Sequence, residues 1–243
     1  MMFRSNVENQ SHNAGSPPVS PEARSPRTCI VIPFKDPSLA KERLSEFLTS
    51  EQRRELALTL FDSTLASLSP FIGRADLLVV TNSPMIGLRA ETAGAHALVE
   101  SKSRGETAAI EEATRWSIAR GYERQVVIPG DMARLDPADI SALLDFRLAP
   151  PSVVLSPAVG DDGTNAIMTS PPDALPFRFG KASFPEYLLR AAELGVQARV
   201  LRLKSLVLDI DTPEDLRHFM KDQLGSPAQR LLMSWGIEEL VTA

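Results

Sequence analysis

Residues 125–132, QVVIPGDM, decide the fold. The apolar run at residues 126–128 is typical of a short buried strand, and Pro129-Gly130 ends it. Asp131 therefore follows the carboxyl end of a strand, where open α/β sheets keep their ligands. The stretch predicts both a sheet and the edge of that sheet at which a functional carboxylate lies.

A second acidic stretch, residues 206–211 (LVLDID), lies near the end of the chain. In an extended backbone Asp209 and Asp211 point to the same face, with Cα atoms roughly 6.5 Å apart. We predict that these two carboxylates converge with Asp131 on a divalent metal ion. A simpler interpretation, in which Asp131 and Asp211 cap the helices that follow them, stays open at this point.

The metal expected from these residues is Mg²⁺, because carboxylate oxygens favour a hard cation. The chain has one cysteine, Cys29, and three histidines that are scattered along the sequence. Zinc is therefore disfavoured, no intramolecular disulfide is possible, and Cys29 is expected to be a core thiol. Mg²⁺ held by carboxylates usually bridges substrate phosphates, which needs no covalent protein nucleophile.

Composition and charge exclude several classes of protein. The 243 residues carry a net charge of −5 and are 43% hydrophobic, which favours a globular protein with no nucleic-acid partner. No apolar run approaches the roughly 18 residues of a membrane span, and the N-terminus lacks a secretion signal. We expect a cytoplasmic protein with no membrane partner.

The chain is expected to consist of a disordered segment, a folded domain and a helical segment. Residues 1–27 are polar and are predicted to be a disordered tail, residues 28–222 form one domain, and residues 223–243 form a helical C-terminal tail. Strand patterns occupy residues 28–34, 76–81, 96–100, 125–128, 153–156, 166–168, 198–203 and 206–210. Helix patterns occupy residues 49–67, 85–94 and 183–193, end at residue 119, and begin after residues 136, 212 and 225. This alternation predicts a single-domain α/β/α sandwich with a mainly parallel sheet.

Three cations, Lys35, Lys41 and Arg43, follow the first predicted strand. Such a loop can surround a triphosphate, since arginine offers a fork of donors and lysine a point charge. The alternative is a solvated basic loop. The sequence contains no G-x-x-x-x-G-K-[ST], G-x-G-x-x-G or G-x-S-x-G pattern. A P-loop NTPase, a dinucleotide-binding domain and a serine hydrolase are therefore disfavoured.

Two loops that contain glycine are candidate ligand sites. Gly105 precedes a predicted helix, where backbone N–H groups are available to a base or a phosphate. Gly180 comes three residues before Ser183 at the start of another helix, and this pair suits a phosphate. The alternative, that Ser183 only caps its helix, stays open.

Five segments, VIPFKDPSLAKERL, VIPGDM, DDGTNAIM, PFRFGKASF and LVLDIDTPEDL, occur in this order. In combination they resemble the guanylyltransferase family of deazaflavin coenzyme F-420 biosynthesis, over residues 28–220. The resemblance implies a Rossmann-like nucleotidyltransferase fold and a reaction that couples GTP to a small phosphorylated acid with release of pyrophosphate. It leaves three acids open, namely phosphoenolpyruvate, 3-phospho-D-glycerate and 2-phospho-L-lactate. The long polar head is less expected of an archaeal chain and favours the first two.

The resemblance also implies roles for single residues. It assigns metal-mediated contacts, with two Mg²⁺ ions, to Asp131, Asp209 and Asp211. It assigns the acid to Thr164, Gly180 and Ser183. It places the GTP phosphates near Lys35, Lys41 and Arg43, and the guanosine near the loop from Arg104 to Thr107, which holds Gly105. Family members can be dimeric, so a homodimer is an option. The chain has Gly105-Glu106-Thr107 where Gly-Leu-Asn is common in the family, which leaves the selection of guanine unexplained.

Two other classes of function stay open from the sequence. A sugar or molybdopterin nucleotidyltransferase shares the sheet and the metal chemistry, but its L-x-G-G-x-S-x-R-x-G loop is missing after the first strand. A nucleotide-binding domain without catalysis is the non-enzymatic alternative. The presence of all three aspartates argues against it.

Overall fold

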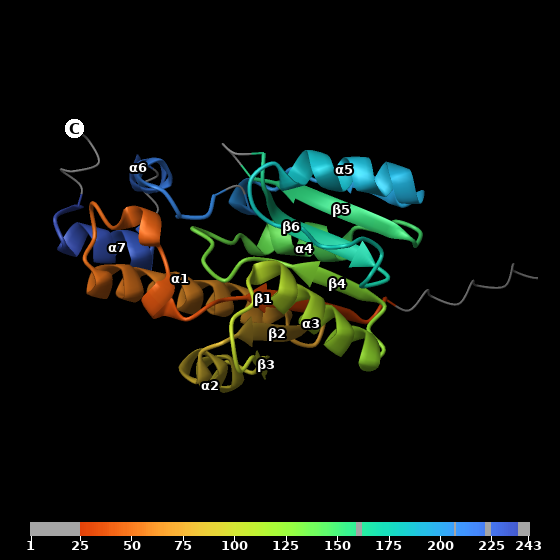
Figure 1. Ribbon diagram of the computed structural model, residues 1–243, viewed down its shortest axis with the longest axis horizontal. Helices are drawn as coiled ribbons and strands as arrows, with labels where there is room; N and C mark the ends of the chain where they lie inside the picture. Colours follow the sequence, from red (N-terminus) through yellow and green to blue (C-terminus); the bar gives the residue numbers. More distant parts are fainter. Residues whose placement is uncertain (1–24, 159–161, 207, 222–224, 238–243) are drawn as a thin grey trace, which may run out of the picture.

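The computed structural model describes residues 25–158, 162–206, 208–221 and 225–237 (Figure 1). The predicted tail at residues 1–24 lies outside the described residues. The described chain forms a seven-stranded sheet in the order β3-β2-β1-β4-β6-β5-β7. Its strands are β1 (Thr28–Pro33), β2 (Asp76–Thr81), β3 (His96–Val99), β4 (Arg124–Val127), β5 (Ser152–Pro157), β6 (Thr164–Ser170) and β7 (Gln197–Val200).

The direction of the strands determines which side chains meet at the site. Each neighbouring pair is parallel except those that include β6, which runs antiparallel between β4 and β5. The prediction of a mainly parallel α/β sheet is therefore confirmed. Because β6 is reversed, its first residues reach the same edge of the sheet as the last residues of β1 and β4.

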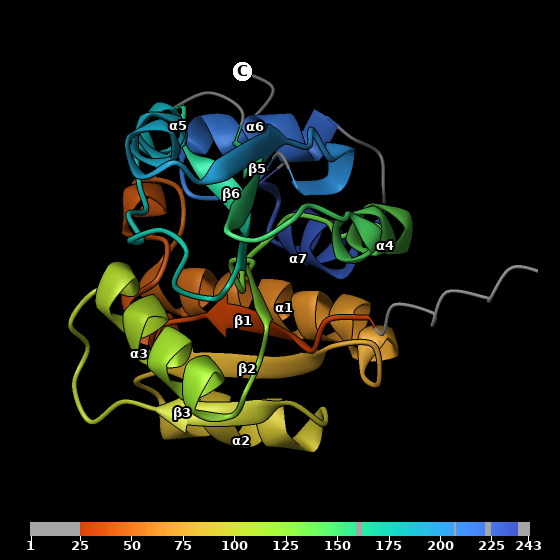
Figure 2. The ribbon, with the colours of Figure 1, turned by 90° about the vertical axis from the view of Figure 1, so that its right-hand side faces the viewer.

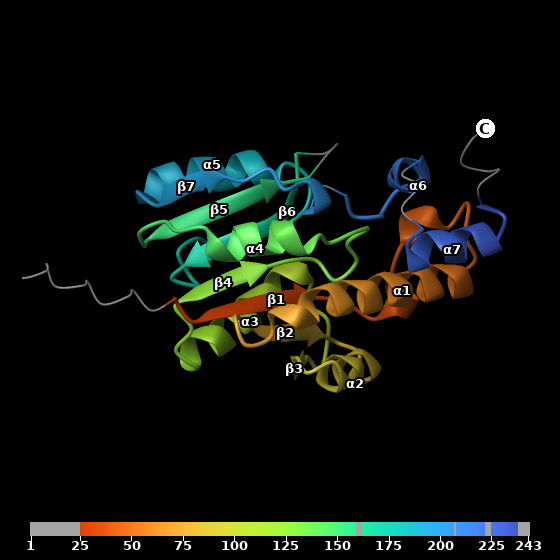
Figure 3. The same ribbon diagram turned by 180° about the vertical axis from the view of Figure 1, so that it is seen from behind.

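Helices cover both faces of the sheet (Figures 2 and 3). The α-helices are α1 (Ser50–Leu68), α2 (Pro84–Thr92), α3 (Glu106–Ala119), α4 (Pro137–Asp145), α5 (Ser183–Leu194), α6 (Pro213–Lys221) and α7 (Pro227–Ser234). Short 3-10 turns are η1 (Pro37–Leu39), η2 (Glu42–Leu44), η3 (Ser69–Phe71) and η4 (Lys204–Leu206). The predicted start of α1 is confirmed, since Thr49 and Gln52 form a capping box there.

Alternate residues of the strands pack into two hydrophobic cores, one on each face of the sheet. Ile30 and Ile32 pack on one face with α1, α2 and α4, whereas Cys29 and Val31 pack on the other with α3 and α5. Cys29 is completely buried, as predicted, and burial raises the pKa of its thiol to about 12. This two-sided burial explains why β1 has no polar alternation.

A third core lies beyond the end of the sheet. It joins η2, the far side of α1, α6 and α7 through buried residues that include Leu44, Leu60, Phe219 and Leu232. The predicted helix after residue 225 is α7, and it packs on α1 in this cluster. Among the described residues, none of the helices is long and apolar enough to cross a membrane.

The strand predicted at residues 206–210 is wrong. Leu206 ends the turn η4, and Asp209 makes only an isolated antiparallel bridge with Met132. The apolar alternation has another cause. Leu206 packs in the core that contains Ile30 and Ile32, whereas Ile210 packs in the third core. The segment therefore crosses between two cores, and the bridge fixes Asp209 beside the loop that follows β4.

Candidate active site

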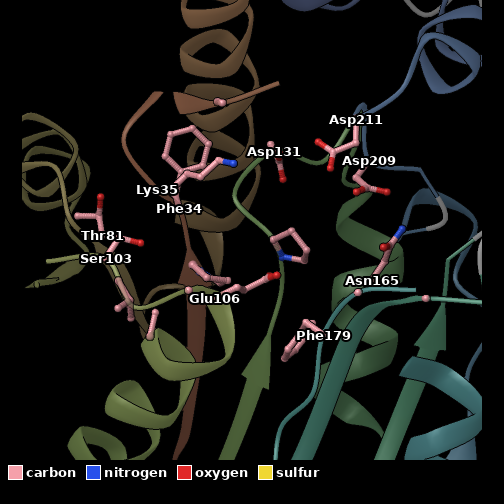
Figure 4. A pocket seen from close by; sticks show the side chains of 18 of the residues that line it. Phe34, Lys35, Thr81, Ser103, Glu106, Asp131, Asn165, Phe179, Asp209 and Asp211 are labelled. Carbon is pink, nitrogen blue, oxygen red and sulfur yellow. The ribbon is translucent and has the colours of Figure 1, made fainter. Parts of the chain in front are cut away.

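A cavity of about 470 Å³ opens at the carboxyl ends of β1, β2 and β4 (Figure 4). Phe34 and Lys35 line it from the end of β1, and Asp131 lines it from the loop after β4. Thr164 and Asn165 reach it from the start of the reversed strand β6. The position agrees with the edge that the sequence predicts for a ligand.

The three predicted metal-binding aspartates all line this cavity. Asp131 and Asp211 are joined by Lys41, whose Nζ donates to both carboxylates, with 3.0 Å to Asp211 Oδ1. Asp209 is held next to the same loop by its bridge to Met132. Segments that are about 80 residues apart in sequence therefore contribute carboxylates to one end of the cavity.

Lys41 is the buried cation of this cluster. Its backbone adopts a left-handed conformation, with φ of 55°, and its side chain has no exposed surface. Burial alone would lower the pKa of Lys41, but Asp131 and Asp211 outweigh it and hold the pKa above its usual value. Lys41 in turn lowers the pKa of Asp211. The alternative of a solvated basic loop is therefore wrong for Lys41.

The alternative that the aspartates cap helices is also wrong. Asp136 is the N-cap of α4, and its side chain accepts from the N–H of Ala138. Before α6, the Asp215 carboxylate accepts from the N–H groups of Asp211 and Thr212. The carboxylates of Asp131 and Asp211 bond to Lys41 instead.

Negative charge accumulates in the cavity beyond what Lys41 balances. Burial, followed by the charges of Asp131 and Asp211, raises the pKa of Asp209 to about 6. Desolvation, followed by the charges of Asp131, Asp209 and Asp211, raises the pKa of Glu106 to about 7, although Glu106 is an exposed residue. A divalent cation would relieve this repulsion, and oxygen ligands without sulfur or imidazole suit Mg²⁺.

The donor chemistry thus fits Mg²⁺, whereas the placement of the carboxylates is not that of a closed metal cage. Within the described residues, no three His, Cys, Asp or Glu side chains lie close enough together to hold a metal ion. The ammonium group of Lys41 lies between two of the expected ligands. Asp131, Asp209 and Asp211 as metal ligands stay a prediction.

Of the three residues predicted to bind the acid, Thr164 and Gly180 line the cavity, whereas Ser183 does not line it and is buried behind Thr164. The hydroxyl of Ser183 donates to Thr164 Oγ1 at 3.1 Å, and both residues are buried. Ser183 N–H donates to the carbonyl of Gly180, whose φ is 105°. Ala182 is the N-cap of α5, so the alternative that Ser183 only caps the helix is wrong. Contact of this trio with an acid stays a prediction.

The residues predicted to bind GTP line the same cavity, with Lys41 held at the aspartates. Lys35, Arg43 and Gly105 line the cavity. Gly105 is the N-cap of α3 with φ of 94°, and no side chain caps the helix. The first N–H groups of α3 therefore have no side-chain acceptor at this cap. The site has a basic and a helix-terminal side, as nucleotide phosphates require.

Among the lining residues, Glu106 and Asn165 received no role of their own from the sequence reasoning, although Glu106 lies in the loop of residues 104–107 that the resemblance places near guanosine. Glu106 lies at the first position of α3, where an acidic residue is ordinary because of the helix dipole, so its position gave no signal. Asn165 follows Thr164 in the GTN segment, and its buried Nδ2 has no hydrogen-bond partner among the described residues. The GTN segment could have indicated Asn165 as a ligand contact.

Comparison with known proteins now identifies the family. The sequence matches the family described as "Guanylyl transferase CofC like" over residues 28–240. The chain belongs to this family. The resemblance drawn from the five segments is confirmed, and the guanylyl transferase is an enzyme of the nucleotidyltransferase class.

The curated relatives are guanylyltransferases that are named after three different acids. The chain is 45% identical over 190 residues to a 3-phospho-D-glycerate guanylyltransferase from Colwellia psychrerythraea, covering 78% of the chain and 90% of the relative. It is 36% identical to a phosphoenolpyruvate guanylyltransferase from Rubrobacter xylanophilus, with coverage of 76% and 90%. It is 31% identical to a 2-phospho-L-lactate guanylyltransferase from Methanothermobacter thermautotrophicus, with coverage of 85% and 90%.

A solved structure shares the fold. The guanylyl transferase aligns with a putative nucleotide-diphospho-sugar transferase from Desulfovibrio desulfuricans G20 with a TM-score of 0.67. The identity is 18%, and the alignment covers 88% of this chain and 96% of the other. The predicted nucleotidyltransferase fold is thereby confirmed.

Proposed function

We propose that this enzyme transfers GMP from GTP to the phosphate of a small phosphorylated acid, releases pyrophosphate, and serves coenzyme F-420 biosynthesis in the cytoplasm. The observation that carries the proposal is the cavity that Asp131, Asp209 and Asp211 line together with the cations Lys35 and Arg43 and with Thr164, which accepts a hydrogen bond from Ser183. The family and the names of the relatives support guanylyl transfer. They do not favour a sugar or molybdopterin substrate or a domain without catalysis.

On this proposal, one group of residues in the cavity binds GTP and another binds the acid. Lys35, Arg43 and Gly105 hold the GTP phosphates and guanosine, while Thr164, Gly180 and Ser183 hold the acid. An oxygen of the acid's phosphate then attacks the α-phosphorus in line, and the bond from that phosphorus to the oxygen bridging to the β-phosphate breaks. Both reactants are anions, so bringing them together requires compensating positive charge.

Lys35 and Arg43 supply part of that charge. Lys41, in contrast, is already paired with Asp131 and Asp211 and keeps these two carboxylates at a fixed separation. Asp131, Asp209 and Asp211 would hold the Mg²⁺, two ions on our proposal. When bound, Mg²⁺ neutralises phosphate charge and stabilises the leaving pyrophosphate. A nucleic-acid partner is not expected, and the homodimer stays a prediction.

The test is pyrophosphate release by the purified protein with GTP and Mg²⁺. Parallel reactions contain 3-phospho-D-glycerate, phosphoenolpyruvate or 2-phospho-L-lactate, and ATP and CTP serve as nucleotide controls. We expect release that needs GTP and one of the acids, with 3-phospho-D-glycerate and phosphoenolpyruvate favoured. Release without an acid, or with ATP as efficiently as with GTP, would contradict the proposal.

A further inference from the structure

The cavity has a second polar end, away from the aspartates, and the reaction proposed above gives its side chains no role. Figure 4 shows Thr81 at this end and Asp211 at the other. Asn82 and Glu100, which directly follow β2 and β3, also line the cavity. The Glu100 N–H donates to the Thr81 carbonyl at 2.8 Å, so the two strand ends place their side chains next to each other.

The strand order sets the distance between the two ends of the cavity. Because β3, β2, β1 and β4 lie side by side in this order, three strand spacings, roughly 14 Å, separate the ends of β3 and β4. Asp131 follows β4, and Lys35 follows β1 between the two ends. Thr164, proposed for the acid, belongs to β6 on the other side of β4. The room for the ribose and base of the nucleotide is therefore on the side of Asn82 and Glu100.

Glu100 is a nearly buried carboxylate with incomplete hydrogen bonding. Its side chain is only 9% exposed. Oε1 accepts from Arg104 Nη2 at 3.3 Å, and this half-exposed arginine shares the same nitrogen with Glu112 at 3.4 Å. Among the described residues, no donor bonds to Oε2 of Glu100. A carboxylate withdrawn from water in this way is suited to accept from donors on a ligand.

Asn82 offers the complementary group beside Glu100. Its Oδ1 accepts from the N–H of Asp36 at 2.9 Å, which fixes the orientation of the amide. Within the part of the chain that the structure describes, Nδ2 of Asn82 donates to no acceptor. This end of the cavity therefore presents a carboxylate acceptor next to an amide donor.

Guanine is the base whose edge matches this pair of groups. It carries two adjacent donors, N1–H and the N2 amino group, next to the acceptor O6. A carboxylate can accept from both donors at once, and an amide nitrogen can donate to O6. Adenine and cytosine have an acceptor nitrogen in place of N1–H, and this nitrogen would face the charge of Glu100 with no proton between them.

We propose that Glu100 accepts hydrogen bonds from N1–H and the N2 amino group of guanine, that Asn82 donates to O6, and that these two residues select GTP over ATP and CTP. The inference rests on the proposed function and names the residues that choose its nucleotide. The loop of residues 104–107 then need not distinguish the bases, so its difference from the common family sequence has no bearing on guanine.

The main test exchanges the hydrogen-bonding pattern at Glu100. In Glu100→Gln the amide oxygen still accepts from N1–H, but the amide nitrogen meets the N2 amino group donor to donor. Xanthine has a carbonyl in place of that amino group and restores the match. We expect kcat/KM for GTP to fall about 10- to 100-fold, and the ratio of kcat/KM for xanthosine triphosphate to that for GTP to rise by at least the same factor.

Two further nucleotides separate the base from the ribose. Inosine triphosphate lacks the N2 amino group, so the parent should prefer GTP to it by about 10-fold or more, and Glu100→Gln should lose this preference. Equal use of GTP and inosine triphosphate by the parent would overturn the proposal. So would a Glu100→Gln variant that lowers the ratio of GTP to 2′-deoxy-GTP and leaves the other ratios unchanged, because the carboxylate would then bind the ribose. Glu111 is exposed on α3 and does not line the cavity, so Glu111→Gln should keep every parental ratio.

Asn82→Asp tests the donor to O6. Aspartate keeps an acceptor for the N–H of Asp36 and removes the amide hydrogens. We expect the ratio of kcat/KM for GTP to that for ATP to fall about 10-fold or more, since the amino group of adenine can donate to the new carboxylate. An unchanged ratio in a variant that thermal melting shows to be folded would overturn the role of Asn82.

Failure of the proposed function gives a separate result, namely no GTP-dependent pyrophosphate release by the parent with any acid. Calorimetric titration of the parent and Glu100→Gln with GTP, inosine triphosphate and xanthosine triphosphate in the presence of Mg²⁺ then tests base selection without turnover. Tightest binding of GTP by the parent and of xanthosine triphosphate by the variant supports the role of Glu100. Equal binding of the three nucleotides by the parent overturns it.

Discussion

The two ends of the sheet hold charged side chains in opposite ways. At the carboxyl end, Asp131, Asp209 and Asp211 share a cavity with Glu106, and Lys41 is the buried cation that pairs with two of them. At the other end, charged groups are paired within the protein. The excess of negative charge at the carboxyl end therefore indicates where a ligand binds. At the other end, charged side chains that are hydrogen-bonded within the protein hold the sheet to its helices.

Arg124 shows how the other end is built. This arginine of β4 is buried and donates to Thr28 Oγ1 at 3.1 Å, the Phe146 carbonyl at 3.1 Å and the Leu144 carbonyl at 2.8 Å. Burial and the charge of Arg147 lower the pKa of Arg124 to about 10, which leaves it protonated at neutral pH. Arg124 thereby fixes the end of α4 against β1 and β4.

The sharpest test of the contrast is Asp209→Asn. We expect pyrophosphate release to fall at least about 1,000-fold, because a proposed metal contact is lost. Since the pKa of Asp209 is raised to about 6, its ionised form is unfavourable in the folded state. Asparagine should therefore raise the Tm in metal-free buffer at pH 8.

The sign of this stability effect is checked by pH. The advantage of Asp209→Asn should shrink as the pH falls through about 6, because Asp209 then takes up a proton in the folded protein. Melting curves at pH 8 and pH 5 measure it. A lower Tm than the parent at pH 8 would break the contrast between the two ends.

Lys41→Met tests a residue that lies at the carboxyl end of the sheet and nevertheless stabilises the fold through its two ion pairs. Its removal leaves Asp131 and Asp211 facing each other without a cation, which costs about 3–5 kcal/mol. We expect a large loss of activity together with a lower Tm, and added Mg²⁺ should raise the Tm of the variant more than that of the parent. Equal shifts with Mg²⁺ would show that the metal does not compensate for the lost ammonium group.

Arg124→Met should affect stability and leave chemistry intact. The Leu144 and Phe146 carbonyls lose their donor, so we expect a loss of about 2–4 kcal/mol in the free energy of unfolding by urea. At a temperature where the variant is folded, its kcat/KM should equal that of the parent. Arg115→Met, a change on the surface of α3, is the matched control and should alter neither quantity.

Tyr122→Phe should give the smallest effect. The Tyr122 hydroxyl donates to Asp76 Oδ2 at 2.6 Å, and we expect a loss of about 1 kcal/mol at pH 8 with unchanged activity. Burial and this hydrogen bond raise the pKa of Tyr122 above its usual value of 10.0. The stabilisation is therefore fully present below pH 10 and is lost progressively as the pH rises from 10 toward the raised pKa of the folded protein, so urea unfolding at pH 8 and pH 10.5 should show the gap between parent and variant narrowing.

Much of this fold follows from local patterns in the sequence. Continuous apolar runs gave β1, β2 and β4, and the cap signals at Thr49 and Asp136 gave the starts of α1 and α4. Asp131 was located correctly because Pro129-Gly130 ends the apolar run at the edge of the sheet. These features depend on residues close in sequence, where propensity and capping act.

The wrong predictions concern residues whose burial or conformation depends on contacts with segments that are distant in sequence. The alternation at Leu206, Leu208 and Ile210 is identical in a strand and in a segment that crosses between two cores. Burial of Lys41 depends on Asp131 and Asp211, which are far away in sequence. Glu106 faces the cavity because of the rotation of α3, which its own sequence does not reveal.

The bridge between Met132 and Asp209 also bears on how the protein is made. A chain that has left the ribosome only as far as β7 already holds Lys35, Lys41 and Asp131, but not Asp209 or Asp211. On the proposed function, such a nascent chain cannot consume GTP, and catalysis begins only after the segment before α6 has docked.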